Sequence, residues 1–124
     1  MFKVDVDLSL VYQQRSGDIL FLIGTLLAII STYQAEQSIV TSTKDNSANT
    51  TALASWLFFI ANIIFVHVAI IRLVELSQPT NSKVSPLMLR GSNFTVIGDI
   101  FKVIGFGIAA IGNQLQANSS NSAP

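Results

Sequence analysis

One block of this sequence occurs twice, and the apolar character of both copies limits what the chain can fold into. Residues Gly17–Ser38 align without gaps with Gly98–Ser119, and 8 of the 22 aligned positions are identical. A longer apolar run, Ala52–Val74, lies between the copies. A helix rises about 1.5 Å per residue, so roughly 20 apolar residues cross a bilayer. The sequence therefore predicts an all-α integral membrane protein with three transmembrane helices, over about residues 17–35, 52–76 and 94–115.

The composition agrees with this class of protein. Half of the residues are hydrophobic and only 11% are charged, whereas a soluble domain carries roughly 25% charged residues. The 124 residues suffice for a single membrane domain. Seven basic and seven acidic residues give no basic patch that would indicate a nucleic-acid partner. With one histidine and no cysteine, we expect no metal centre, no cofactor and no enzymatic activity.

Charge interrupts the third apolar segment. Asp99 and Lys102 shorten its continuous apolar stretch to Val103–Ile111, which by itself would indicate an interfacial or buried helix. Its similarity to the first segment is the reason to predict a third span.

Residues 2–12 alternate between apolar and polar side chains. This period of two predicts a short β-strand. Such a strand would lie outside the bilayer and pair with another edge, because a lone strand cannot satisfy its backbone groups in lipid. The alternative is a short amphipathic helix on the membrane surface, since Val4, Leu8 and Val11 also fit helical spacing. In both cases residues 1–14 form an extramembrane segment.

The connecting segments are polar or contain helix breakers. Residues 38–51 are rich in Ser, Thr and Asn, and residues 77–93 contain Pro79, Pro86 and Gly91, which argue against a continuous helix. Residues 117–124 form an uncharged polar tail that we expect to be flexible.

The distribution of Lys and Arg predicts the orientation. With three spans, the side of the N-terminus carries nearly all of the basic residues, namely Lys3, Arg15, Arg72, Lys83 and Arg90, and Lys102 lies nearest to it. The opposite side carries Lys44. The positive-inside rule then predicts a cytoplasmic N-terminus and an outside C-terminus, in a bacterial-type inner or internal membrane.

Small residues recur every seven positions in both copies of the block. The predicted helix-packing residues are Gly17, Gly24, Ala28 and Ser31 in the first copy and Gly98, Gly105, Ala109 and Gly112 in the second. Such a stripe lets two helix backbones approach closely in a membrane. It serves either self-association between chains or packing on the middle helix of the same chain.

Asp18 and Asp99 occupy matching positions in the two copies. Each is predicted in the first turn of its helix, where a carboxylate stabilises the positive end of the helix dipole. The alternative is a pair of proton- or cation-binding carboxylates at membrane depth. Lys102 follows Asp99 by three residues, so it is placed either to pair with that carboxylate or to reach the interface.

Four further polar residues fall in or at the end of the middle helix. Asn62 and His67 lie inside it, where a histidine either relays protons or makes one interhelical hydrogen bond. Arg72 and Glu75 close the helix on the predicted cytoplasmic side, as an interfacial pair.

Three short apolar motifs carry a resemblance to a known family. Leu20–Leu27, Trp56–Ile60 and Ile70–Leu73 resemble the YrhK-like family of small bacterial membrane proteins. The resemblance covers about residues 17–77 and implies a two-helix hairpin and a prokaryotic or phage source, with no catalytic activity. The chain departs from the family pattern at Ala61-Asn62, where a Gly-Ser pair is usual, and in its third helix and alternating N-terminus.

These observations favour association over catalysis. We expect a small multi-pass membrane protein that acts as an accessory or structural subunit of a larger membrane assembly. Its partners would be the lipid bilayer and either other membrane subunits or further copies of itself. One alternative is an oligomeric pore or holin-like permeabiliser, lined by polar residues such as Asp18, Asn62 and His67. Another is a proton- or cation-coupled membrane component.

Overall fold

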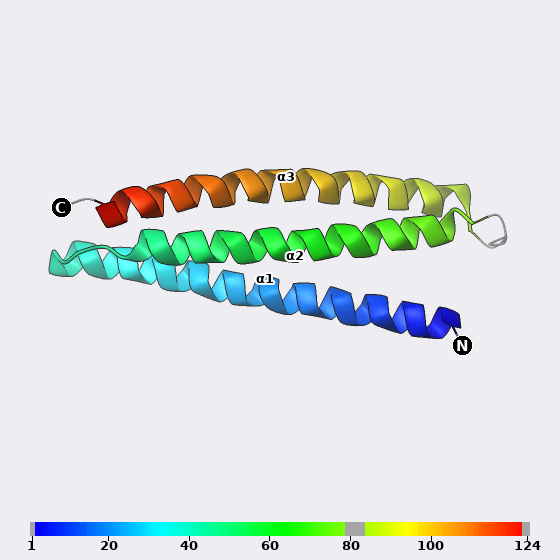
Figure 1. Ribbon diagram of the computed structural model, residues 1–124, viewed down its shortest axis with the longest axis horizontal. Coiled ribbons are helices and arrows are strands. Elements are labelled where there is room, and N and C mark those ends of the chain that lie inside the picture. Colours follow the sequence, from blue (N-terminus) through cyan, green and yellow to red (C-terminus); the bar gives the residue numbers. More distant parts are fainter. Residues whose placement is uncertain (1, 79–83, 123–124) are drawn as a thin grey trace.

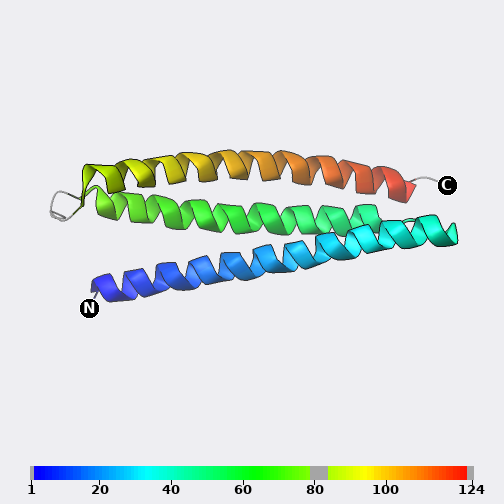
Figure 2. The same ribbon diagram turned by 180° about the vertical axis from the view of Figure 1, so that it is seen from behind.

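The structure is an antiparallel layer of three long helices. The computed structural model describes residues 2–78 and 84–122, which form α1 (Phe2–Thr41), α2 (Ser47–Leu76) and α3 (Pro86–Ser122). Figure 1 shows α2 between α1 and α3, with α1 and α3 parallel to each other. The view from behind shows the same order (Figure 2). Within these residues, no Cα atom of α1 lies within 8 Å of one in α3, so α2 is the shared neighbour of both.

All three helices are long and apolar enough to cross a membrane, by length and composition. The all-helical, three-helix part of the prediction is therefore confirmed. The helices are longer than the predicted spans, at 40, 30 and 37 residues. Because a helix rises about 1.5 Å per residue, each is longer than the roughly 30 Å hydrocarbon core of a bilayer.

The helices pack through positions that repeat every seven residues. In α1 the buried positions are Leu10, Gly17, Gly24 and Ser31, and in α3 they are Val96, Ala110 and Ala117. In α2, Ala54, Ala61 and Val68 follow the same period. A period of seven keeps a narrow seam in contact along two gently supercoiled helices, so small side chains run through both seams.

The prediction of a β-strand over residues 2–12 is wrong. These residues form the first three turns of α1, and the structure contains no strand within residues 2–78 and 84–122. A helix satisfies its own backbone hydrogen bonds, whereas a strand here would need a partner edge. The helical spacing also places Leu10 in the seam, where it is 2% exposed.

The prediction that Asp18 and Asp99 lie in the first turns of their helices is also wrong. Asp18 follows Phe2, the first residue of α1, by 16 positions, and Asp99 follows Pro86, the first residue of α3, by 13. Pro86 starts α3 because a proline at the first helical position loses no hydrogen bond. The hydroxyl of Ser85 accepts a hydrogen bond from the backbone N–H of Met88 at 3.1 Å and caps the helix.

A tight connection joins α1 to α2. Ser42 adopts the left-handed conformation, with φ of 54°, and the N–H of Thr43 donates to the carbonyl oxygen of Ser38 at 3.1 Å. These two features form a Schellman motif that ends α1. The carboxylate of Asp45 accepts a hydrogen bond from the backbone N–H of Ser47 at 2.7 Å, at the start of α2. Hydrogen bonds from Ser47 lower the pKa of Asp45 below its ordinary value of 3.8.

The polar segment at the C-terminus differs from the predicted flexible tail. Residues 117–122 continue α3 as helix, and residues 123–124 lie outside the described part of the chain. The side chains of Asn121 and Asn49 exchange two hydrogen bonds, of 3.1 and 2.9 Å, which hold the end of α3 beside the start of α2.

Candidate functional site

The small residues of the first repeat copy are buried against α2. A Cβ atom placed at Gly24 would lie 2.9 Å from a ring carbon of Phe58 and 3.3 Å from the carbonyl oxygen of Ala54. A Cβ atom at Gly17 would lie 2.5 Å from the ring of Phe65. These glycines therefore admit phenylalanine rings where any side chain would collide, which is the packing role within one chain that the spacing predicts.

Ser31 continues this stripe and adds hydrogen bonds. Its hydroxyl donates to the carbonyl oxygen of Ser47 at 3.0 Å and also contacts the hydroxyl of Thr51. Ala28 is half-buried beside the stripe.

The matching glycines of the second copy face away from α2. Nothing lies within 4 Å of a Cβ atom placed at Gly98, Gly105 or Gly112, and Ala109 is exposed. The α3 seam instead uses Val96 and Ala110, together with Gly107 on the ring of Phe59. Val96 precedes Gly98 by two residues, which is a turn of about 200° around the helix. The second stripe is therefore on the outside of the layer.

Large apolar side chains accompany these open glycines. Gly91 extends the stripe by one more interval of seven, and it also has nothing within 4 Å of a Cβ position. Five side chains, also seven apart, are between 64% and 77% exposed: Leu87, Phe94, Phe101, Ile108 and Leu115. We call these four glycines and five apolar residues the α3 outer stripe.

Polar side chains bind the three helices together near the α1–α2 connection. The indole N–H of Trp56 donates to the side-chain oxygen of Gln114 at 3.0 Å, and the amide of Asn113 donates to the hydroxyl of Ser55 at 2.5 Å. On the other side of α2, the hydroxyl of Thr50 donates to the side-chain oxygen of Gln34 at 2.7 Å. Sequence reasoning missed these pairs, because partners 16 and 58 positions apart carry no local signal.

A groove opens between α1 and α3 over the other half of α2. A cavity of about 540 Å³ is lined by residues from all three helices: Asp18, Phe21, Asn62, Phe65, Lys102 and Phe106. An adjoining cavity of about 330 Å³ shares Phe65 and Lys102 with the first and adds polar residues that include Gln14, Arg72 and Asp99. We call the two cavities together the charged groove.

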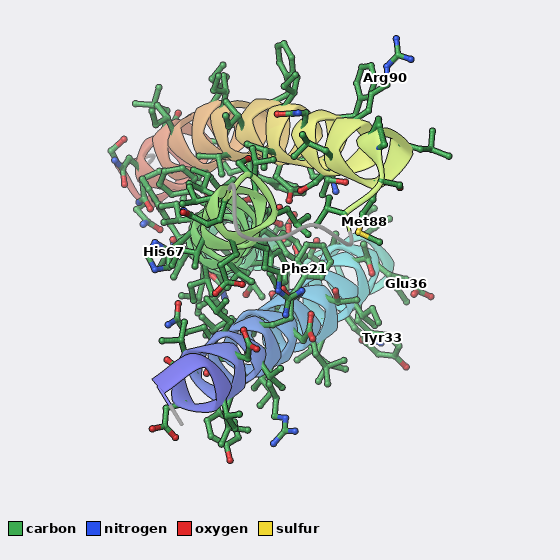
Figure 3. The ribbon with its side chains drawn as sticks, turned by 90° about the vertical axis from the view of Figure 1, so that its right-hand side faces the viewer. Phe21, Tyr33, Glu36, His67, Met88 and Arg90 are labelled. Carbon is green, nitrogen blue, oxygen red and sulfur yellow. The ribbon has the colours of Figure 1, made fainter. Side chains whose placement is uncertain are left out.

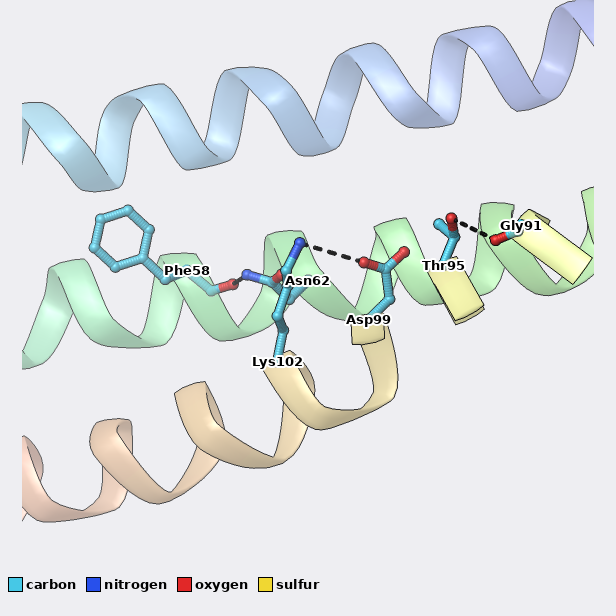
Figure 4. A network of polar contacts seen from close by, with 6 residues as sticks. All are labelled: Phe58, Asn62, Gly91, Thr95, Asp99 and Lys102. Carbon is cyan, nitrogen blue, oxygen red and sulfur yellow. Dashed lines mark hydrogen bonds and ion pairs between the residues drawn. The ribbon is translucent and has the colours of Figure 1, made fainter. Parts of the chain in front are cut away.

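Hydrogen bonds hold two polar side chains of the groove in place. The ammonium of Lys102 lies 3.5 Å from the carboxylate of Asp99, which is the first of the two arrangements that the spacing allows for Lys102. Asn62 is 2% exposed, and its amide nitrogen donates to the carbonyl oxygen of Phe58 at 2.8 Å. Figure 4 shows both contacts, with the Lys102 side chain extending from α3 across α2.

The charged groove brings together five of the seven polar residues that the sequence singled out: Asp18, Asn62, Arg72, Asp99 and Lys102. His67 is exposed, and Figure 3 shows its ring at the edge of α2, away from Phe21. Glu75 lines neither cavity, and it forms no ion pair with Arg72. Within residues 2–78 and 84–122, no cluster of His, Cys, Asp or Glu could hold a metal ion.

Comparisons with known proteins give no match: no family model, no curated protein and no solved structure resembles this chain closely enough to assign it. The resemblance to the YrhK-like family stays a prediction.

Proposed function

We propose that this chain is a small multi-pass membrane protein that acts as a structural subunit and associates through the α3 outer stripe. Three helices long and apolar enough to cross a membrane support the membrane placement. The observation that carries the association is the uncovered stripe itself. Four glycines at strict intervals of seven lie open along one face of α3, flanked by five exposed apolar side chains.

The glycines of this stripe are difficult to explain as a surface for lipid alone. Glycine in a helix interior is roughly 1 kcal/mol less favourable than alanine. Close approach of a second helix offsets this cost, because small residues let two backbones gain van der Waals contacts in lipid. The period of seven matches that of the two seams inside the chain, so the neighbour is a helix crossing α3 at a similarly shallow angle.

The neighbour we propose is a second copy of this chain. Inside the chain, Gly17, Gly24 and Gly107 each meet a phenylalanine ring. The α3 outer stripe carries both halves of that contact, because Phe94 and Phe101 are 66% and 69% exposed beside the open glycines. One face that holds both partners of a contact is self-complementary, which is what a two-fold dimer requires.

Native mass spectrometry of the particle, extracted from its membrane in polymer nanodiscs without cross-linking, tests this proposal. We expect a mass of at least twice the 13.4 kDa of one chain. A strictly monomeric particle would contradict self-association, and a single copy bound to other proteins would replace the second copy with a different subunit.

The proposed orientation places the N-terminus in the cytoplasm. Arg15, Arg72 and Arg90 lie toward the end of the layer that carries the N-terminus, and Lys44 lies in the connection at the other end. Because the chain has no cysteine, single variants Lys44→Cys and Arg90→Cys can each be labelled with an impermeant maleimide. We expect Lys44→Cys to react in intact cells and Arg90→Cys only after lysis. The reverse pattern would invert the topology.

An oligomeric pore is the second candidate, and the charged groove is the observation that favours it. Asp18, Asn62 and Lys102 share one cavity, as residues lining a lumen would. Planar-bilayer recordings that show steady conductance, reduced in Lys102→Gln, would support a pore. The absence of conductance between pH 5 and 8 would count against it. A proton- or cation-coupled role would need His67 or the pair Asp18 and Asp99 to face water, and unchanged function of His67→Phe would argue against that residue.

A further inference from the structure

We propose that the charged groove binds the head group of a zwitterionic phospholipid, one that carries a phosphate and a primary ammonium. This inference rests on the proposed membrane placement and is independent of self-association. In a bilayer, a groove between α1 and α3 that no protein fills is open to lipid. The residues that line it determine which lipid fits best.

The charges of the groove match a zwitterion. Two cationic side chains, Lys102 and Arg72, and two carboxylates, Asp18 and Asp99, line the two adjoining cavities. A purely anionic head group would meet both carboxylates, and a purely cationic one would meet both bases. A head group with a phosphate beside an ammonium lets each charge face an opposite one, through charge-assisted hydrogen bonds.

The apolar part of the groove fits an acyl chain. Phe21 from α1, Phe58 from α2 and Phe106 from α3 form one aromatic cluster, with ring centroids 4.7, 5.7 and 6.3 Å apart. Phe21 and Phe106 line the larger cavity together with Phe65. This cluster lies deeper in the apolar segments than Arg72 does. A lipid whose phosphate is near Arg72 and Lys102 would therefore lay a chain along the phenylalanine rings.

Asn62 supplies a buried polar group at the junction of the two regions. It is 2% exposed and lines the larger cavity, and its one hydrogen bond among the described residues uses the amide nitrogen. Its side-chain oxygen is therefore an acceptor for an ammonium or a glycerol hydroxyl. Lys102 is held by Asp99 at 3.5 Å, yet its side chain is 61% exposed, so its ammonium can also donate to a phosphate.

Retention of lipids by the full chain tests this site. The delipidated protein in mild detergent is titrated with phospholipids of identical acyl chains whose head groups are ethanolamine, glycerol or choline, and native mass spectrometry counts the retained lipids. We expect the ethanolamine lipid to bind about tenfold more tightly than the glycerol lipid, the scale of one charge-assisted hydrogen bond. The choline lipid should fall between them, because its quaternary ammonium has no N–H to donate. Equal retention of all three would overturn the proposal.

Variants at two exposed positions test the cationic and the anionic side chains of the groove separately. Lys102→Gln should weaken binding of all three lipids by about tenfold, and Asp18→Asn should remove the preference for ethanolamine while binding of the glycerol lipid is kept. Arg90→Gln is the matched control, because Arg90 lines neither cavity and Figure 3 shows it pointing away from α2. Loss of the preference in Arg90→Gln, its survival in Asp18→Asn, or unchanged lipid binding in Lys102→Gln would contradict the assignment.

Two further experiments distinguish a bound lipid from a soluble ligand, and the lipid site from the membrane placement. Glycerophosphoethanolamine, the head group without acyl chains, should compete poorly, because it cannot use the phenylalanine rings. Full competition would overturn a lipid as the occupant and leave a soluble phosphate–ammonium ligand. Extraction of membranes at alkaline pH tests the membrane placement separately. Release of the protein would contradict both the membrane placement and the lipid site. A protein that stays in the membrane but shows no lipid preference would contradict the lipid site alone.

Discussion

The two copies of the repeated block have the same spacing of small residues but different neighbours. In α1, Gly17 and Gly24 receive phenylalanine rings of α2, whereas in α3 the matching Gly98 and Gly105 have nothing within 4 Å of a Cβ position. Both copies lie at the same level of α2, because Asp18 and Lys102 border the same cavity beside Phe65. The difference therefore lies in the direction that the stripe faces.

The placement of the two helices explains this difference. The helices α1 and α3 run parallel on opposite sides of α2 (Figure 1). If the two copies are related by translation, their stripes face the same way in space. The stripe of α1 then meets α2, and the stripe of α3 faces outward. A repeat of this kind leaves one half of its contact open, which is why we propose a neighbour from outside the chain.

The largest expected effect comes from adding a side chain to one copy at a time. Gly24→Leu should lower the free energy of unfolding by roughly 1–3 kcal/mol, because the new atoms would meet Phe58 and the backbone of Ala54. Gly105→Leu should leave it unchanged or raise it by up to about 1 kcal/mol, through helix propensity. Unfolding in mixed micelles, at a dilution at which the chain is monomeric, measures both. Equal destabilisation by the two variants would mean that the copies are not packed differently.

Removal of the Ser31 hydroxyl, at the third position of the α1 stripe, is expected to lower the free energy of unfolding by a smaller amount. Ser31→Ala removes the hydrogen bonds to Ser47 and Thr51 from a buried seam and should cost about 1 kcal/mol. Its counterpart in the repeat, Gly112→Ala, adds a methyl group to open space and should change stability by a few tenths of a kcal/mol at most. The same titration of the monomeric chain compares them, and a loss of stability in Gly112→Ala would show that this face is covered within the chain.

The connection that holds α1 against α2 offers a stabilising change. Ser42 is a non-glycine residue with φ of 54°, and glycine adopts this conformation without the steric cost that other residues have. Ser42→Gly should raise the free energy of unfolding by about 0.5–1 kcal/mol. The exposed neighbour Thr43→Gly is the control and should not stabilise.

The smallest effect concerns the start of α2. Hydrogen bonds from Ser47 lower the pKa of Asp45, so this contact stabilises the helix start above pH 3.8 and is lost as the pH falls through the lower, folded-state pKa. We expect the Ser47 amide resonance to move at a midpoint below 3.8. The movement should disappear in Asp45→Asn. A midpoint above 3.8 would mean that folding raises the pKa of Asp45, which contradicts the prediction.

The fold class and the packing stripe of α1 were predictable from the sequence because both follow from local periodicity. Runs of apolar residues predict the helices, and Gly17, Gly24 and Ser31 predict a face. The helix ends were not predictable in this way. Alternation in residues 2–12 gives an equally good strand pattern, and only the absence of a pairing edge decides for helix. The Ser85–Pro86 cap is a signal that sequence reasoning missed.

The candidate site was only partly predictable. Asp18, Asn62 and Lys102 stand out as polar residues in apolar helices, but their meeting in one cavity depends on how three helices are rotated about their axes. The spacing that predicts a stripe on α3 does not say whether α2 covers it. That depends on Val96 and Ala110, which form the seam on the opposite side.

Site-specific photo-cross-linking in native membranes tests the proposed contact between the α3 outer stripe and a second copy of the chain. Benzoylphenylalanine replaces Phe101 in the stripe or, as a control, Leu22, which is 58% exposed on α1. This contact predicts an adduct of twice the 13.4 kDa chain mass from position 101 and none from position 22. Lipid adducts alone from position 101, at the level seen for position 22, would contradict it.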